Sequence, residues 1–498
     1  MNYLIRNGSI IDPARRVATV GDVLVVDGKV ERVIDMAEMG VDPGPLPEGT
    51  EIIHAGGCVV APGFTDLYAE LGEPGHEQRE TIATGMRAAV QGGFTMVCAM
   101  PNTNPVLDSA AVAHQVTALA QREGQGHVAL IGAVTQGREG KILTEMIELA
   151  EAGCVAFSDA GRTILDAGVM RNALAYAAAL DLPIMSHCED ARLGLNWVMH
   201  EGAVSMRLGL PGLPAAAEEI IIARDIALAE DTRAHLHICQ VSTAAGVALI
   251  RAAKERGVRV TAEVSPHHLA LSDTWVLGSL APQPNPPPTP QPTPRGKGKS
   301  RRNSAPELGL PSWLDPTLLP PYDSSTRIRP PLRSEQDIEA LIIGLNDGTI
   351  DAIASGHTPR TRVEKECEYG AAAPGISSLE TALGLVLTLV HRGEMDLVNT
   401  VARLTEGPAQ VMGRSPATLR PGSRADIVIF DPDRMWTVER SQLVSLGKNT
   451  PLQGQQLKGQ VMLTMVSGQV AFRRGEFGMY GRGGPQSSKI AGIFGDVT

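Results

Sequence analysis

Hydrophobic and polar residues alternate along the first sixty residues, around short turn sequences. Within residues 23–30, two valine-rich runs flank Asp27-Gly28, a dipeptide that is typical of a tight hairpin turn. A period of two places every second side chain on the same face of a strand. This pattern predicts a small β-sheet at the start of the chain.

A different pattern runs from about residue 63 to residue 405. Short apolar runs at 95–100, 128–133, 183–187 and 260–264 alternate with alanine-rich stretches of helical composition. Repeated units of a strand followed by a helix are typical of a parallel α/β barrel. A chain of 498 residues has room for such a barrel, which takes roughly 250 residues or more, and for a smaller domain.

The alternating β pattern returns after residue 405, in 425–431 and 459–470. Between the two patterns, eight of the thirteen residues 282–294 are proline, and five Lys or Arg residues follow by position 302. Such a composition favours extended chain that buries no core. Two interpretations of this insertion, residues 281–325, stay open: a tolerated solvated loop, or a docking arm for an acidic or SH3-like partner.

Composition and charge narrow the class of protein. The net charge of −11 disfavours nucleic-acid binding, which needs clustered Lys and Arg. The six cysteines are scattered without a C-x-x-C pair, as in proteins whose thiols stay reduced. No apolar run reaches the roughly 18 residues of a membrane helix, and the first residues lack the pattern of a secretory signal. We therefore expect a cytoplasmic protein with neither a membrane span nor a nucleic-acid partner.

Several short segments resemble the type I dihydroorotases of the amidohydrolase superfamily. They are APGFTDL at 61–67, EPG at 73–75, MPNT at 100–103, LETA at 379–382, PGSRAD at 421–426 and NTPL at 449–452. The resemblance implies an amidohydrolase-type (β/α)₈ TIM-like barrel with a discontinuous small β-sandwich that both chain ends form. The expected parts are 1–62 and 405–480 for the β-sandwich, 63–404 for the barrel with its insertion, and 481–498 for a flexible tail.

Active members of that family hydrolyse a cyclic amide at a binuclear zinc centre. The resemblance implies where its ligands would lie: a His-x-His pair, a carboxylate, two further histidines and an Asp that also acts as general acid/base. In this chain only one of the six matched positions keeps the family residue, His187. The six are Tyr68, Glu70, Ala160, His187, Gln240 and Gly356.

These replacements predict the loss of the ancestral chemistry. A zinc site needs three or four nitrogen, sulfur or carboxylate ligands, and without zinc no bound water has its pKa lowered toward 7. Gly356, at the position of the general base, has no side chain to move a proton. We therefore expect no catalytic residue, no metal ligand and no cofactor. Asn102 would be a vestigial substrate-binding residue, while Gly72 replaces a family Arg, and Arg329 and Arg360 leave two guanidiniums in the pocket.

The resemblance also suggests a role without catalysis. Some bacterial dihydroorotase homologues that lack zinc ligands serve as structural subunits of aspartate carbamoyltransferase. The main expectation is that this chain is such an inactive assembly subunit in pyrimidine biosynthesis, oligomeric and bound to aspartate carbamoyltransferase.

The alternative is a zinc-dependent dihydroorotase with a reduced metal site, which interconverts dihydroorotate and carbamoyl-aspartate. Its metal would be held by Glu70, Asp159 and His187 with either His237 or His357. Strand alternation argues against this set. His237 precedes Gln240 by an odd number of residues and Asp159 precedes Ala160 by one, so both side chains are expected to face out of the barrel.

Overall fold

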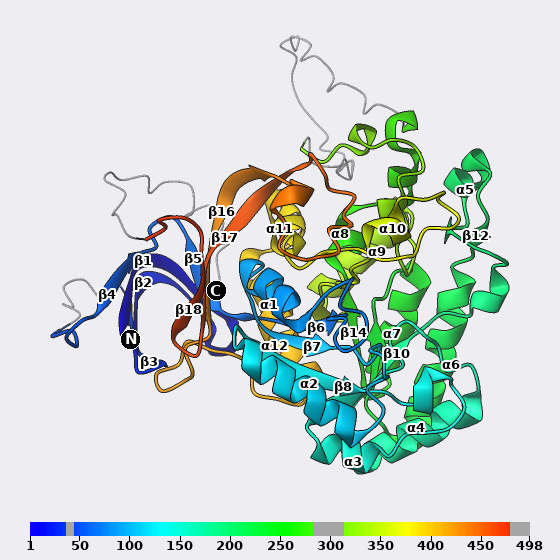
Figure 1. The fold of residues 1–498 in the computed structure, drawn as a ribbon, viewed down its shortest axis with the longest axis horizontal. Coiled ribbons are helices and arrows are strands. Elements are labelled where there is room, and N and C mark those ends of the chain that lie inside the picture. Colours follow the sequence, from blue (N-terminus) through cyan, green and yellow to red (C-terminus); the bar gives the residue numbers. More distant parts are fainter. Residues whose placement is uncertain (36–43, 282–312, 479–498) are drawn as a thin grey trace, which may run out of the picture.

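A computed structural model describes residues 1–35, 44–281 and 313–478. Its first sheet collects strands from both ends of the chain, and Figure 1 shows it on the left beside the barrel. The strand order is β18-β17-β16-β5-β1-β2-β3, and β4 pairs with β1. The strands are β1 (Tyr3–Asp12), β2 (Val17–Val26), β3 (Lys29–Asp35), β4 (Glu51–His54), β5 (Val59–Pro62), β16 (Ile427–Thr437), β17 (Gln456–Val466) and β18 (Gln469–Arg473).

The hairpin that the sequence predicts at Asp27-Gly28 joins β2 to β3. Both residues have positive φ, 48° and 79°, as a tight two-residue hairpin turn requires. The two chain ends meet at β5, which runs parallel to β1 and antiparallel to β16. One apolar cluster, which includes Ile5, Val60 and Ile427, joins the N-terminal and C-terminal strands into a single packed unit.

The second sheet is a nearly closed parallel barrel. Its strands follow one another in chain order: β6 (Phe64–Ala69), β7 (Phe94–Ala99), β8 (His127–Gly132), β9 (Cys154–Phe157), β10 (Ile184–His187), β13 (Leu236–Cys239), β14 (Val260–Val264) and β15 (Ala352–Ile353). A parallel bridge between Ala69 and His357 brings the end of the first strand to the segment after the last. There the amide of Glu70 donates to the carbonyl of His357 at 2.8 Å. The predicted fold class is therefore confirmed.

Helices surround the barrel (Figure 1). Those of the strand–helix units are α1 (Ile82–Gln91), α2 (Ala110–Glu123), α3 (Met146–Glu151), α4 (Ala167–Ala179), α6 (Ala216–Thr232), α7 (Ala244–Glu255), α9 (Glu335–Asn346) and α12 (Leu397–Val411). Further elements are α5 (Ala203–Leu208), α8 (Pro266–Ala270), α10 (Arg362–Lys365), α11 (Ala382–His391), β11 (Met199–His200) and β12 (Gly212–Leu213). Hydroxyl groups start several helices: Thr81, Thr243 and Ser334 each accept a hydrogen bond from a backbone amide in the first turn.

Apolar side chains fill the barrel on both faces of its strands. Ile238 packs in the layer between the strands and the outer helices, whereas Cys239 belongs to the interior cluster with Leu67, Ile131 and Ala354. Because the interior is packed, a site that a substrate can enter lies where the strands end, at the carboxyl face of the barrel. In the described part of the chain, no helix is long and apolar enough to cross a membrane.

The proline-rich residues 282–312 and the tail from 479 lie outside the described residues, so both interpretations of the insertion and the predicted flexible tail stay predictions. From residue 313 onward, the chain packs against the rest of the protein. Leu314 and Leu319 are buried in a cluster with Trp275 and Leu452. The amide of Asp315 donates to the side chain of Gln455 at 2.8 Å.

Candidate functional site

The six positions that the family resemblance matched all lie at the carboxyl face of the barrel, and all are buried. Tyr68 lies at the end of β6 and Glu70 directly follows that strand, while His187 ends β10. The other three lie one to three residues beyond the ends of β9, β13 and β15, with backbone φ of 31° at Ala160, 52° at Gln240 and 64° at Gly356. These left-handed conformations mark the points where the chain leaves the strands and turns around the mouth of the barrel.

Glu70 is occupied by an ion pair. Its Oε2 lies 2.6 Å from Nη1 of Arg360, and both side chains are largely buried. Burial would raise the pKa of Glu70, but Arg360, Arg138 and Arg79 outweigh burial and hold that pKa below its ordinary value. The carboxylate is therefore ionised, with its charge already balanced by a guanidinium.

His187 is an isolated imidazole. It is buried, and neither of its ring nitrogens has a hydrogen-bond partner within the described residues. Its Nε2 lies 3.7 Å from Oε2 of Glu189, whose carboxylate is also bound by Nε of Arg329 at 3.0 Å. Burial would raise the pKa of Glu189, but His187 and Arg329 together lower it to about 2. Arg329, like Arg360, is thus neutralised by a carboxylate rather than free in the pocket.

Tyr68 keeps its proton. Burial, and then the nearby acidic groups Glu70 and Cys239, raise the pKa of its phenol well above its ordinary value. A Cβ on Gly161 would lie 3.7 Å from its hydroxyl, so the ring reaches the loop that carries Ala160. A neutral phenol beside a methyl group is a poor replacement for an imidazole and a carboxylate.

The last two matched positions, Gln240 and Gly356, lie side by side. A Cβ on Gly356 would lie 2.8 Å from Nε2 of Gln240 and 2.8 Å from Oγ of Ser265. The position of the general base therefore lacks a carboxylate. An amide and a hydroxyl also occupy the space that its side chain would need.

Restoring that carboxylate is expected to cost stability. In Gly356→Asp the new side chain meets Gln240 and Ser265, so we expect the free energy of unfolding to fall by about 1–3 kcal/mol more than in Gly413→Asp. Gly413 is a matched control because its φ of 62° is similar and nothing lies within 4 Å of an added Cβ. Urea titrations of both variants measure the difference, and equal losses would mean that the corner around Gly356 is not crowded.

The donor set at the family's metal position does not fit zinc. His187 has free ring nitrogens, but Glu70 is held by Arg360, and the remaining four residues offer no carboxylate, thiolate or imidazole. One available ligand is fewer than the three or four that zinc needs. Asn102 lies half-buried in the loop after β7, and its substrate-binding role stays a prediction.

Two further residues of the alternative metal set are also engaged elsewhere. Asp159 accepts hydrogen bonds from the amides of Val134 and Thr135, each at 3.0 Å. His357 lies between the amide of Ser378, at 3.2 Å from its Nδ1, and Oε2 of Glu80, at 3.3 Å from its Nε2. Both side chains stabilise loops around the mouth and leave no free donor for an ion.

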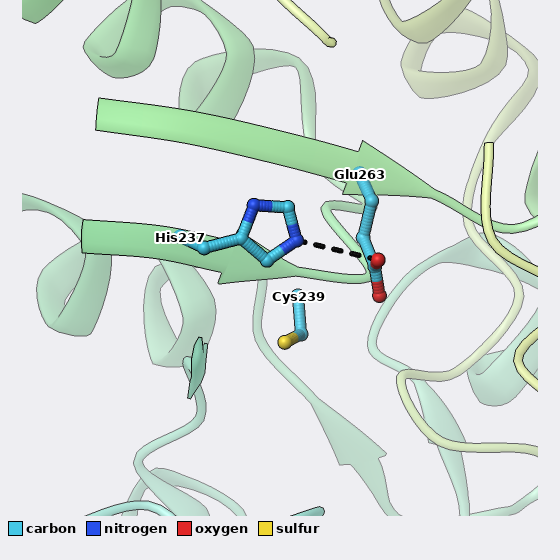
Figure 2. Close-up of side chains that lie close together, drawn as sticks. All are labelled: His237, Cys239 and Glu263. Atoms are coloured by element: carbon cyan, nitrogen blue, oxygen red, sulfur yellow. Dashed lines mark ion pairs between the residues drawn. The ribbon is translucent and has the colours of Figure 1, made fainter. Parts of the chain in front are cut away.

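A second group of donors lies inside the barrel: His237, Cys239 and Glu263 (Figure 2). One ligand atom from each residue lies within 4.8 Å of the others, and all three are buried. His237 Nε2 and Glu263 Oε2 are 3.3 Å apart. Burial lowers the pKa of His237 to about 3 and raises the pKa of Glu263 to about 8.

The expectation that His237 faces out of the barrel is therefore wrong. The alternation was counted from Gln240, but β13 ends at Cys239 and Gln240 has a φ of 52°. His237 and Cys239 are two residues apart within the strand and so face the same, inner side. The motif His-x-Cys on one strand with Glu on the next was visible in the sequence and is the signal that could have identified this group.

Comparisons with known proteins place these observations in a family. The family model described as Dihydro-orotase-like matches residues 57–245. The protein named Dihydroorotase from Pelotomaculum thermopropionicum is 44% identical over 95% of this chain and 99% of its own length. The Dihydroorotase of Syntrophus aciditrophicus is 40% identical over 95% of this chain and all of its own length.

Solved structures share the fold. The L-hydantoinase (dihydropyrimidinase) from Arthrobacter aurescens superposes with a TM-score of 0.76 at 24% identity, over 95% of this chain and 97% of that one. The D-hydantoinase (dihydropyrimidinase) from Thermus sp. gives a TM-score of 0.72 at 23% identity, over 95% and 96%. At these identities the likeness concerns only the fold, that is, the arrangement of the barrel and of the sheet that both chain ends form.

Proposed function

We propose that this chain, which belongs to the dihydroorotase family, acts as a dihydroorotase, a zinc-dependent cyclic amidohydrolase that interconverts dihydroorotate and carbamoyl-aspartate. One observation carries the proposal: four relatives named Dihydroorotase are 40–44% identical over 95% of this chain and 98–100% of their own lengths. Identity at this level over these lengths includes both the barrel and the sheet that the two chain ends form.

The expectation of a catalytically inactive assembly subunit is corrected by these relatives. That expectation inferred a loss of activity from the replacement of metal ligands at five positions. The relatives, which match over nearly their whole lengths, carry the name of the enzyme. The expectation of no cofactor is corrected for the same reason, and because the barrel interior holds a group of three residues able to bind a metal. Of the two functions considered from the sequence, the reduced-site enzyme is the better supported.

At the mouth, this chain's own residues can orient a ligand and exclude water. Arg138, Arg329 and Arg360 bring three guanidiniums to the carboxyl face, and the carboxylates of Glu70 and Glu189 fix two of them in place. Arg329 is the more accessible of these two, with one third of its side chain exposed, and it stacks over Trp197 at 5.7 Å. A substrate carboxylate would meet Arg329 first, because Arg360 is more deeply buried. The metal supplies Lewis-acid chemistry when it is bound.

Turnover by the purified chain tests the proposal. The chain, produced in a host that lacks its own dihydroorotase and supplied with zinc, should cyclise carbamoyl-aspartate and hydrolyse dihydroorotate above the blank. Chelation should abolish both reactions, and added zinc should restore them. A zinc-loaded chain that gives no turnover in either direction would overturn the proposal.

An association with aspartate carbamoyltransferase is a separate matter from catalysis. We keep it, together with an oligomeric state and the absence of nucleic-acid partners, as a proposal that rests on the family resemblance and on the net charge of −11. The cytoplasmic location expected from the cysteine pattern likewise stays a prediction.

A further inference from the structure

Three side chains that could hold a metal ion meet on neighbouring barrel strands, His237 and Cys239 on β13 and Glu263 on β14. Ile238 of β13 pairs with Ala262 of β14, so Cys239 and Glu263 come next on two adjacent strands. His237 lies two residues before Cys239 and faces the same side. Figure 2 shows its ring directed along the barrel toward the Glu263 carboxylate, with Cys239 beside the pair.

The polar atoms of this group lack hydrogen-bond partners, although His237 Nε2 and Glu263 Oε2 lie 3.3 Å apart. Nε2 of His237 and both carboxylate oxygens of Glu263 are fully buried, and none makes a hydrogen bond within the described residues. Buried polar groups are nearly always satisfied, and leaving one unsatisfied costs about 1–3 kcal/mol. Such a set of atoms in one place indicates a ligand that satisfies them together.

Asp66 shows how the same barrel treats another buried carboxylate. One of its oxygens accepts from the amide of Ser355 at 2.6 Å and the other from the hydroxyl of Ser355 at 2.5 Å. Glu263 is buried equally deeply and has no such donor, nor any Lys or Arg ion pair among the residues that the structure describes. The difference singles out Glu263 as a buried carboxyl group for which the described residues supply no hydrogen-bond donor.

Thr261 orients the imidazole. Its hydroxyl lies 3.0 Å from Nδ1 of His237 and 2.9 Å from Nε2 of His235. When Thr261 donates to His235, it accepts the proton on Nδ1 of His237, which leaves the Nε2 lone pair directed at the unpartnered group. A second hydrogen bond that fixes the tautomer in this way is the usual support of a metal-binding histidine.

We propose that His237, Cys239 and Glu263 bind one divalent cation of the zinc class inside the barrel. The donors are an imidazole, a sulfur and a carboxylate, the set that zinc prefers. Tetrahedral ligands at about 2.0–2.3 Å from zinc lie roughly 3.3–3.8 Å from one another, and the His237–Glu263 distance is already 3.3 Å. A thiolate and a carboxylate also balance the two positive charges of the ion, so the buried group becomes neutral.

The inference goes beyond the proposed function and rests on it only for the identity of the metal, because the three side chains are buried in the packed interior and an ion held there would be a structural one. The two can fail separately. Metal content and ligation are measured without substrate, whereas turnover is measured without reference to which residues bind the ion.

Cobalt substitution of the full chain is the test. Cobalt bound by Cys239 should give the sulfur-to-cobalt charge-transfer absorption of a thiolate complex, at about one cobalt per chain. The band should vanish in C239S and persist in C98S, a matched control because Cys98 is also a buried cysteine of the barrel interior, beside Met412. In E263Q, zinc affinity should fall at least about tenfold.

Contrary outcomes are clear. The proposal would be overturned if the unmodified chain gave no charge-transfer band, or if C239S retained the band. The first of these outcomes does not depend on whether a variant folds, because it is measured on the natural sequence. Zinc bound with unchanged affinity in E263Q would also overturn it. Turnover that persists in a chain without the band would reject this site and leave the proposed function standing.

Discussion

Replacing Arg360 by methionine is expected to lower the free energy of unfolding by about 3–5 kcal/mol at pH 7. The change removes the guanidinium 2.6 Å from Glu70 and leaves that carboxylate buried at the mouth of the barrel. Breaking one side of a buried pair is costly because the remaining charge has lost both water and its partner. Urea titrations of the two proteins measure the loss.

The pH dependence of this loss gives an independent check. The pKa of Glu70 is lowered in the folded protein, so its contribution to stability is present above the unfolded value of about 4.3 and disappears as the pH falls through the folded value. In Arg360→Met the unpaired carboxyl becomes neutral as the pH falls. The difference in stability between the two proteins should therefore shrink from pH 7 toward pH 4.

The matched control removes both charges. Glu70→Leu combined with Arg360→Met should recover most of the lost stability, because two apolar side chains leave no unpaired charge. A loss of less than 1 kcal/mol in Arg360→Met, or a loss that does not change with pH, would mean that Glu70 does not depend on Arg360.

Glu218→Ala is expected to have a similarly large effect, about 3–5 kcal/mol. Glu218 lies on α6, and its Oε1 accepts hydrogen bonds from the amides of Ser242 and Thr243 at 2.9 Å and 3.0 Å. It also lies 3.5 Å from the guanidinium of Arg333, which is only 2% exposed. Removing the carboxylate would leave two amides and a buried charge without their partner.

The loss of Glu218 should also disturb the candidate metal site, because Ser242 and Thr243 lie three and four residues beyond Cys239, the last residue of the strand that carries His237. We therefore expect weaker zinc binding in Glu218→Ala as well as lower stability. Glu219→Ala is the matched control. Glu219 is the next residue on the same helix and is half-buried, so the loss of its side chain should change the free energy of unfolding by no more than about 0.5 kcal/mol. Equal losses in the two variants would contradict the role given to Glu218.

Local patterns predicted the fold well. The Asp27-Gly28 hairpin and the strand–helix units of the barrel follow from short-range rules, because a turn or a strand depends on the residues beside it. The pairing of both chain ends in one sheet came from the family resemblance, since nothing in the period of residues 59–62 or 427–437 indicates that these strands pair.

The site was predicted less well because its contacts join distant residues. Glu70 and Arg360 are 290 positions apart, and Glu189 and Arg329 are 140 apart, so no spacing rule could pair them. The direction of His237 was wrong because strand alternation was carried one residue beyond the end of β13, to Gln240. The family resemblance pointed only to its six matched positions. The donors inside the barrel were therefore missed, and the expectation of no cofactor was wrong.

The central proposal is that this chain is a zinc-dependent dihydroorotase, and the further inference places a zinc ion between β13 and β14. Zinc per chain and turnover, measured on one preparation, test it most directly. We predict about one zinc per chain, and turnover that falls with the zinc when a chelator is added. Less than about 0.1 zinc per chain after incubation with zinc, together with no turnover, would contradict the claim.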